Sequence, residues 1–321
     1  MLEKFINDIK KFDFSTLKVA VVFGGKFSES AVSRDTAKSF QEALVVLKIP
    51  HRMIEFSNNL IAEIQLYHPD VVLNAMHGTF GEDGRLPVLL DFLGYKYTHS
   101  GYYPSFCGMQ KDIAQILCEQ WGAPVIPSIR VDKKDIIKEN IADFFTQLQT
   151  DKLVIKPNDD GSSVGVVILN QSDAQWNYSQ INDSKSEHFL VQKYIDGVEI
   201  STPVFFGKAV GSLELSPKSG FYDYKNKYTD GLTEHIFPAR ISEELSNNAI
   251  EYAETAYKAL NCSGIARVDF RVDMQNNTLY LLEINTHPGM TKLSIVPDVA
   301  ARQSVDFQTL VALMIYDAYC K

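Results

Sequence analysis

Short apolar runs and helix-like stretches alternate over the first hundred residues of the chain. Residues 18–23 and 71–75 are apolar and rich in β-branched side chains, which predicts two buried strands. Residues 33–47 and 86–93 have the pattern of helices, and Gly94 is a suitable end for the second one. Strands that alternate with helices are typical of a parallel α/β sheet.

The rest of the chain forms two further units, and residues 1–17 are an added amphipathic extension. We expect units at residues 18–100, 101–195 and 196–321. Further helices are expected at residues 112–121, 135–149, 243–260 and 307–318. Further strands are expected at residues 153–156, 164–169, 189–194, 200–206, 267–272 and 279–285.

Composition and charge exclude several classes of protein. With 45% hydrophobic and 22% charged residues, the 321-residue chain has the composition of a soluble globular protein. Its formal net charge of −9 argues against binding of nucleic acid. We expect no membrane span and no secretory signal, because no apolar run is long enough. Four scattered cysteines form neither a zinc pattern nor a disulfide framework, so a cytoplasmic protein is expected.

Alternating charged residues mark two of the expected strands near the C-terminus. In an extended strand Arg267 and Asp269 share one face, as do Glu283 and Asn285 in the other strand. If the strands pair as a hairpin, two carboxylates and an amide oxygen converge, and such oxygens suit Mg²⁺. Arg267 beside them suits a substrate carboxylate or a developing oxyanion. The alternative, a sheet face with solvated charges, stays open on this pattern alone.

A loop rich in glycine and serine separates two expected strands, and it reads NDDGSSVG after Lys156. Glycines allow close approach of the backbone, successive N–H groups can hold an anion, and Lys156 supplies a positive charge to phosphate. The loop lacks the GxxxxGK[ST] pattern and is therefore no P-loop. A plain hairpin connection is the alternative interpretation.

Two other segments are ambiguous by themselves. His77 lies in a loop after the second expected strand, with Glu82 nearby, and a lone loop histidine is usually a surface or hydrogen-bonded residue. Residues 221–228, with the sequence FYDYKNKY, are too polar for a buried strand and too aromatic for a free linker. They fit either a lid that closes over a reactive intermediate or an ordered surface loop packed by its tyrosines.

Five segments, in this order, closely resemble the D-alanine–D-alanine ligases of the ATP-grasp superfamily. They read VVFGGKFSESAVS, NAMHGTFGEDGRLPVLLDFLGYKYTHSG, KPNDDGSSVGV, FYDYKNKY and RVDF…LLEINTHPGMTKLSIVP. The resemblance runs from about Val19 to near the C-terminus. It implies a three-domain ATP-grasp architecture of the α/β class, α+β in part. An N-terminal parallel-sheet substrate domain (18–100) would precede a central small domain (101–195) and a C-terminal mixed-sheet catalytic domain (196–321).

The resemblance implies a nucleotide site and a metal site. Lysines would contact the ATP phosphates, serines would cover them, and a strand end would hold the adenine and ribose. The ATP-binding residues so implied are Lys111, Lys156, Ser162, Ser163, Gln192, Lys193, Ile195, Glu199 and Lys227. The ligands implied for two Mg²⁺ ions, for which Mn²⁺ can substitute, are Asp269, Glu283 and Asn285.

The resemblance also implies catalytic and substrate-binding residues. Groups near the reacting atoms, including an oxyanion site and a link to the lid, would be Glu29, Ser162, Tyr228, Arg267 and Gly289. Groups that bind the two amino acids would be Glu29, His77, Arg267 and Ser294.

The reaction implied is ATP-dependent joining of two D-alanines through an acylphosphate, for peptidoglycan precursors, by a homodimer. Tyr228 favours an amine as second substrate, because relatives that accept D-lactate carry histidine at that lid position. One alternative is a ligase of the same superfamily with another amino acid pair, which Glu29, His77, Tyr228 and Ser294 would select. The other is a nucleotide-binding protein without turnover, and the retained lysines and metal ligands argue against it.

Overall fold

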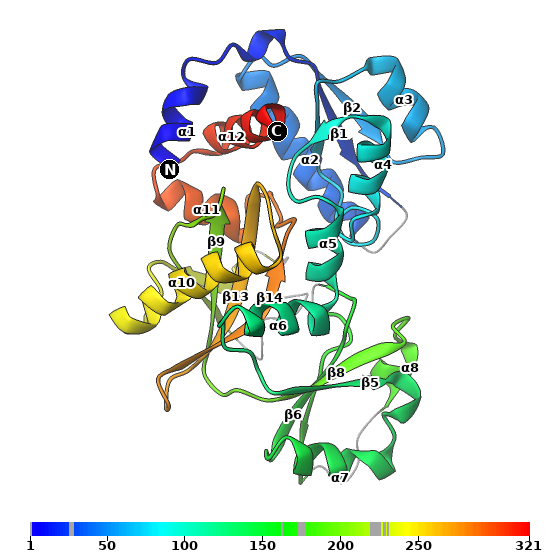
Figure 1. Ribbon diagram of the computed structural model, residues 1–321, viewed down its shortest axis with the longest axis vertical. Coiled ribbons are helices and arrows are strands. Elements are labelled where there is room, and N and C mark those ends of the chain that lie inside the picture. The colour runs from blue at the N-terminus through cyan, green and yellow to red at the C-terminus, as the bar shows by residue number, and fades with distance from the viewer. Residues whose placement is uncertain are drawn as a thin grey trace.

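The computed structural model describes residues 2–25, 29–161, 163–172, 178–218, 226, 229 and 231–321. Figure 1 shows three sheets arranged one below another along the longest axis of the molecule. The first sheet is built from residues 19–97, the lowest from residues 128–193, and the middle one from residues 198–285. The lowest sheet therefore precedes the middle sheet along the chain.

The first sheet is parallel and has the strand order β2-β1-β3-β4. Its strands are β1 (Val19–Phe23), β2 (His51–Glu55), β3 (Val71–Asn74) and β4 (Lys96–Tyr97). Its helices are α2 (Ser30–Val46), α3 (Leu60–Tyr67) and α4 (Arg85–Leu93). The central strands β1 and β3 are apolar except for the buried Asn74 at the end of β3, because both faces of a parallel sheet are covered, and the sequence predicted both strands. Strand β2 and helix α3 were not predicted from the sequence.

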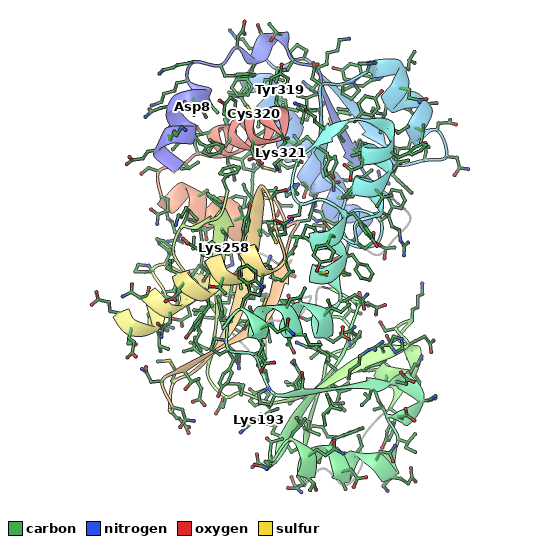
Figure 2. The ribbon with its side chains drawn as sticks, viewed as in Figure 1. Asp8, Lys193, Lys258, Tyr319, Cys320 and Lys321 are labelled. Atoms are coloured by element: carbon green, nitrogen blue, oxygen red, sulfur yellow. The ribbon has the colours of Figure 1, made fainter. Side chains whose placement is uncertain are left out.

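Both ends of the chain pack on this first unit. The C-terminal helix α12 (Phe307–Cys320) contacts α2, β3 and β4, and α11 (Ile295–Arg302) precedes it. The N-terminal helix α1 (Leu2–Ile9) lies against α12, followed by the short η1 (Phe14–Thr16). Figure 2 shows Asp8 of α1 at the same end of the molecule as Tyr319, Cys320 and Lys321. The expected N-terminal extension is thus folded against the last helix.

The middle sheet is antiparallel, with the order β12-β11-β9-β13-β14 and with β10 paired to β9. Its strands are β9 (Val198–Phe205), β10 (Lys208–Ala209), β11 (Leu213–Pro217), β12 (Thr233–Ile236), β13 (Ile265–Asp273) and β14 (Thr278–Asn285). Helix α10 (Glu243–Ala259) crosses one face of this sheet (Figure 1), and Ser242 caps it by accepting a hydrogen bond from the Leu245 N–H. Helices α5 (Tyr102–Met109) and α6 (Lys111–Gln120) lie beside β14.

The lowest sheet is a small antiparallel sheet with the order β5-β8-β6-β7. Its strands are β5 (Ser128–Asp132), β6 (Lys152–Pro157), β7 (Val167–Asn170) and β8 (His188–Lys193). Helices η2 (Lys133–Asp135), α7 (Lys138–Gln147) and α8 (Ser179–Asp183) complete this unit. Its core is built around Phe144, Phe145 and Phe189. Within the described ranges, no helix is both long and apolar enough to cross a membrane.

Candidate active site

Two adjoining cavities lie where the three sheets meet. The upper cavity, about 1000 Å³ including space open to solvent, is lined from α2, the loop after β3, α5, β13, β14 and the loop after β14. The lower cavity, about 880 Å³, lies between the lowest sheet and the middle sheet. Residues that line both cavities are Lys111, Asp160, Gly161 and Glu283. A ligand in the lower cavity can therefore reach a second ligand in the upper one.

The hairpin of β13 and β14 brings the predicted acidic side chains together. Arg267 is paired with Asn285, and Asp269 is paired with Glu283, on the face away from α10. The Asp269 carboxylate is buried and accepts hydrogen bonds of 2.9 and 2.7 Å from Nε and Nη2 of Arg267. Ser201 on β9 donates a further hydrogen bond of 2.5 Å to it. The arginine therefore compensates the buried charge of Asp269.

The donor set of this hairpin fits a divalent cation of the magnesium type. Glu283 and Asn285 line the upper cavity, and Asp269 lies opposite Glu283 in the adjacent strand. The Asn285 amide oxygen accepts a 2.9 Å hydrogen bond from the His287 N–H, which fixes the orientation of the side chain. Two carboxylates and one amide oxygen leave further coordination positions for water and phosphate, as Mg²⁺ prefers.

A β-bulge lies beside these residues in β14. Asp269 is paired with Glu283 but Phe270 is paired with Leu281, so Leu282 is an extra residue in the strand. Leu281 and Ile284 consequently both face the core under α10, while Leu282 and Glu283 both line the lower cavity. The bulge thus adds the apolar side chain of Leu282, which was not predicted as a site residue, next to the acidic side chain of Glu283.

Apolar side chains and one anchored loop form the lower cavity. The apolar side chains come from both sheets and from the segments next to their strands, and they are Ile126, Val154, Val164, Val166, Ile168 and Leu282. The predicted segment at residues 192–195 lines one side. Arg271 of β13 holds this segment, because its Nε donates a 3.0 Å hydrogen bond to the Ile195 carbonyl. Its Nη1 lies 3.8 Å from the Glu199 carboxylate. This slot suits a planar base with a sugar near Glu199.

Gln192 is buried at the back of the lower cavity. Its Nε2 donates a 3.3 Å hydrogen bond to the Oε1 of Gln115 on α6. The same oxygen accepts a 3.1 Å hydrogen bond from Ser128. The side-chain amide of Gln192 is therefore paired with the side-chain amide of Gln115. Gln115 was not predicted from the sequence as a site residue.

Two buried lysines border the cavities. Lys111, in the first turn of α6, is 8% exposed and lines both cavities, while Lys156 at the end of β6 is 5% exposed and lines the lower one. The Lys111 ammonium donates a hydrogen bond to the Asp160 carbonyl in the Gly/Ser loop. Burial raises the pKa of the Asp160 carboxyl, although Gly161 N–H and Lys111 oppose the shift. Two buried cations at one border suit a polyphosphate.

Glu29 and His77 lie on the side of the upper cavity formed by the first unit. Glu29 precedes α2, and its carboxylate lies so close to Gly78 that a Cβ there would be 1.9 Å from Oε2. The His77 ring is fixed at both nitrogens, with Nδ1 2.8 Å from the Glu82 carboxylate and Nε2 2.9 Å from the Thr36 hydroxyl. Glu82 and Thr36 therefore determine how His77 is presented, and neither was predicted as a site residue.

Gly289 and Ser294 lie on the opposite side, in the loop after β14. The Ser294 hydroxyl oxygen accepts a 3.0 Å hydrogen bond from the Thr291 N–H and lies 2.9 Å from the Thr291 hydroxyl. A Cβ at position 289 would lie 2.8 Å from the Ser294 oxygen, so a side chain there would have to displace the Ser294 hydroxyl. The Gly289 backbone therefore faces the cavity without a side chain.

Three of the predicted residues, Ser162, Lys227 and Tyr228, lie outside the described residues. Ser163 and Lys193 are described and line the lower cavity. The sequence places Arg271 on the same strand face as Arg267 and Asp269, but no role was predicted for it.

Three sheets with a nucleotide-sized slot between two of them, bordered by buried lysines, define the ATP-grasp class of fold. Residues 117–316 match the family model for the C-terminus of D-Ala–D-Ala ligases. A D-alanine–D-alanine ligase of Wolbachia sp. subsp. Drosophila simulans (strain wRi) is 36% identical over 304 residues, covering 94% of this chain and 93% of that protein. One from Rickettsia canadensis (strain McKiel) is 37% identical over 308 residues, covering 95% and 85%. The chain belongs to the D-alanine–D-alanine ligase family.

Solved structures agree with this assignment and confirm the predicted fold class. The crystal structure of a D-alanine–D-alanine ligase from Bacillus anthracis complexed with ATP has a TM-score of 0.80 and 26% identity, covering 94% of this chain and 97% of that chain. The VanG D-Ala:D-Ser ligase from Enterococcus faecalis has a TM-score of 0.77 and 25% identity, covering 94% and 99%.

Proposed function

We propose that this chain is an ATP-dependent ligase that joins two D-alanines, through an acylphosphate, to the dipeptide used for peptidoglycan precursors. The border shared by the two cavities carries this proposal. Lys111, Asp160, Gly161 and Glu283 line both cavities, so a nucleotide in the lower one directs its terminal phosphate toward the upper one. The names of the relatives, and the ATP bound in one similar crystal structure, support the choice of substrates.

In the lower cavity we assign the base to the segment from Gln192 to Ile195 and the ribose to Glu199. Arg271 holds the Ile195 carbonyl, and the apolar slot excludes water from the base. Lys111 and Lys156 bind the phosphates, together with the Gly/Ser loop that contains Ser163. These groups orient the γ-phosphate for attack from the upper cavity.

In the first step the carboxylate of the first D-alanine attacks the γ-phosphate, which gives an acylphosphate and ADP. Glu29 binds the ammonium of that D-alanine, and His77 lies near its carboxylate. Asp269, Glu283 and Asn285 would hold two Mg²⁺ ions, which supply neutralisation of charge on the phosphoryl oxygens. The lysines contribute the remaining positive charge.

In the second step the amine of the second D-alanine attacks the acylphosphate carbon, a C–N bond forms, and phosphate leaves. Ser294 binds the carboxylate of this D-alanine, and the Gly289 N–H with Arg267 stabilises the oxyanion of the tetrahedral intermediate. Water must be excluded meanwhile, because it would hydrolyse the acylphosphate. We assign this task to the segment with Lys227 and Tyr228, together with Ser162.

An assay with the purified protein tests the function. The chain would be incubated with ATP, Mg²⁺ and D-alanine, with phosphate release followed and the product identified by mass spectrometry. We expect release of one phosphate per dipeptide. No ADP formation with millimolar D-alanine contradicts the proposal, and turnover only with another amino acid pair supports the second candidate, a ligase of the same fold with different substrates. The likeness to a D-Ala:D-Ser ligase makes D-serine the first alternative to test.

We also propose a cytoplasmic location, where ATP is available, a homodimeric state, and domain boundaries at residues 17, 100 and 195. Light scattering of the purified protein measures the oligomeric state, and a monomer at micromolar concentration contradicts the dimer.

A further inference from the structure

A buried cluster of three histidines adjoins the upper cavity, and one of them, His77, lines it. His77, His99 and His287 are 5%, 4% and 3% exposed. The ring centroids of His99 and His287 are 3.9 Å apart, with the planes tilted by 40°, and His287 meets His77 edge-on at 5.4 Å. The rings come from the loop after β3, the linker after β4 and the loop after β14. The cluster therefore joins the first unit to the loop that carries Gly289.

His99 occupies its position at two separate costs. Its φ angle is +72°, a left-handed conformation that favours glycine. Neither ring nitrogen has a partner in hydrogen-bonding geometry in the described chain. The nearby backbone of Thr98 raises the pKa of His99, but the effect of burial is larger and lowers it. Burial lowers the pKa of His99 to about 3, so the ring is neutral. Glycine would avoid both costs, which indicates that the ring itself has a role.

Tertiary contacts hold the strained backbone of His99 in place. The Ser263 hydroxyl donates a 2.9 Å hydrogen bond to the His99 carbonyl. Ser263 N–H also donates to the Ser100 hydroxyl at 3.1 Å. A Cβ on Gly264 would lie 3.2 Å from the His99 Cα, so the two backbones are closely packed. The imidazole is consequently presented to His287 from a rigid support that includes the start of β13.

The tautomer of His287 follows from its neighbour Asn74. The Asn74 oxygen accepts a 3.0 Å hydrogen bond from the Met76 N–H, and Asn74 Nδ2 donates a 3.0 Å hydrogen bond to the Gly81 carbonyl. These two contacts fix the amide, so Nδ2 is also the donor toward His287 Nδ1 at 3.3 Å. His287 Nδ1 is therefore an unprotonated acceptor. The same Asn74 ties the segment from Met76 to Gly81, which carries His77, to the loop after β14.

We propose that His99 and His287 form a positioning pair that holds the Pro288–Gly289 turn at a fixed distance from the subsite of His77. The His287 ring accepts a hydrogen bond from Asn74 on one side and packs against the His99 ring on the other. The backbone N–H of His287 orients the Asn285 side chain. The pair sets where the Gly289 N–H meets the developing oxyanion. This inference rests on the proposed function, because the oxyanion arises in the attack of the second amine. Neither histidine touches substrate, so both act through Gly289 and Asn285.

The test uses His99→Gly, because glycine adopts the φ of this position and only the ring is lost. We expect kcat for dipeptide formation to fall about tenfold, since an oxyanion donor out of position loses part of its effect, while KM for ATP changes less than about twofold. We also expect more phosphate than dipeptide, because slowed amine attack lets water take the acylphosphate. His99→Asn, which also tolerates a left-handed backbone, should show the same pattern if His99→Gly folds poorly.

His68→Gly is the matched control, because His68 also has a left-handed backbone (φ +52°) but lies exposed at the end of α3. It should leave kcat and the product ratio unchanged. At the second ring, His287→Asn keeps an oxygen that accepts from Asn74 and should retain more activity than His287→Leu. The double variant His99→Gly/His287→Asn should be no slower than the slower single variant, because the two rings act as a unit.

A lower melting temperature of His99→Gly with unchanged kcat and one phosphate per dipeptide overturns the inference, since the pair is then structural only. Equal losses in His68→Gly and His99→Gly overturn it as well. If the unaltered chain releases no phosphate with D-alanine, the proposed function fails, and the inference fails with it. Normal turnover by the unaltered chain together with normal turnover by His99→Gly contradicts the inference alone.

Discussion

At the residue scale, the position of the Glu29 carboxylate depends on the absence of a side chain at position 78. A Cβ on Gly78 would lie 1.9 Å from Glu29 Oε2, and the φ angle of +65° already disfavours other residues. Gly78→Ala should therefore displace Glu29 from the upper cavity. We expect KM for the first D-alanine to rise about tenfold or more, with KM for ATP unchanged, in steady-state kinetics.

Gly94→Ala separates the steric effect from backbone strain. Gly94 ends α4 with a φ of +75°, but a Cβ there meets nothing within 4 Å. Both variants should lose about 1 kcal/mol of stability from the left-handed backbone. If Gly78→Ala and Gly94→Ala have equal KM values for the first D-alanine, Glu29 does not bind that amino acid.

A second residue-scale prediction concerns Asp269, whose carboxylate is engaged by Arg267 and Ser201. Asp269→Asn keeps the shape but removes the charge that the guanidinium, and the proposed metal ion, would share. We expect kcat to fall about 100-fold or more, and thermal unfolding to show a loss of about 1–3 kcal/mol because the partly buried Arg267 loses its ionic partner.

Asp273→Asn is the control for this substitution, because Asp273 lies in the same strand but its carboxylate caps the turn at Gln275 and Asn276. It should leave kcat unchanged. If Asp269→Asn retains full activity across Mg²⁺ concentrations, Asp269 is not a metal ligand.

At the scale of elements, the β-bulge in β14 places two neighbouring leucines in different environments, one in the cavity and one in the core. Leu282 lines the lower cavity, whereas Leu281 is buried under α10. Leu282→Ala should raise KM for ATP about tenfold, through loss of apolar contact with the base, and leave the melting temperature nearly unchanged.

Leu281→Ala should do the reverse. Removing a fully buried leucine costs about 2–5 kcal/mol, so the melting temperature should fall while KM for ATP stays the same. Calorimetry and nucleotide titration of the two variants check this exchange of effects. If KM for ATP rises in neither variant, the slot beside Leu282 does not bind the nucleotide.

The elements that the sequence predicted are those with local signals. Strand β1 is a continuous apolar run, β3 is apolar up to Asn74, and α4 ends at a glycine with a left-handed backbone. Strand β2 was missed because only Ile54 of its five residues is buried, as expected at the edge of a sheet. A short polar edge strand has no periodicity that distinguishes it from a loop.

The same distinction holds within the candidate site. The convergence of Asp269 and Glu283 could be predicted, because strand alternation and one hairpin are enough to bring them together. The role of Leu282 could not, because a bulge depends on how two strands pair. His99 gave no signal in the sequence either, since its burial and its contact with His287 come from packing between distant segments.

At the scale of the whole molecule, the N-terminal helix fastens the first unit to the end of β9. The Phe5 ring stacks on Phe206 at 4.7 Å and meets Tyr316 of α12 edge-on at 6.3 Å. Phe5→Ala should cost about 3 kcal/mol or less, because the ring is only partly buried, and lower the melting temperature without changing kcat at 25 °C.

Leu66→Ala is the control for Phe5, since Leu66 is 78% exposed and should be neutral. A loss of kcat in Phe5→Ala at a temperature where the protein is fully folded would mean that this contact also sets the distance between the two cavity walls.

The return of α12 to the first sheet has a consequence for the order of synthesis. Val19, Val21 and Leu73 share a core with Leu310 and Val311 near the far end of the chain. A ribosome makes these strands first and α12 last, so that face of the sheet is covered only in part, by α2, while the other two units emerge and fold. The first part of the molecule to be translated is therefore the last to be completed, and a chain that stops before α12 presents a partly uncovered apolar sheet face to the chaperones of the cell.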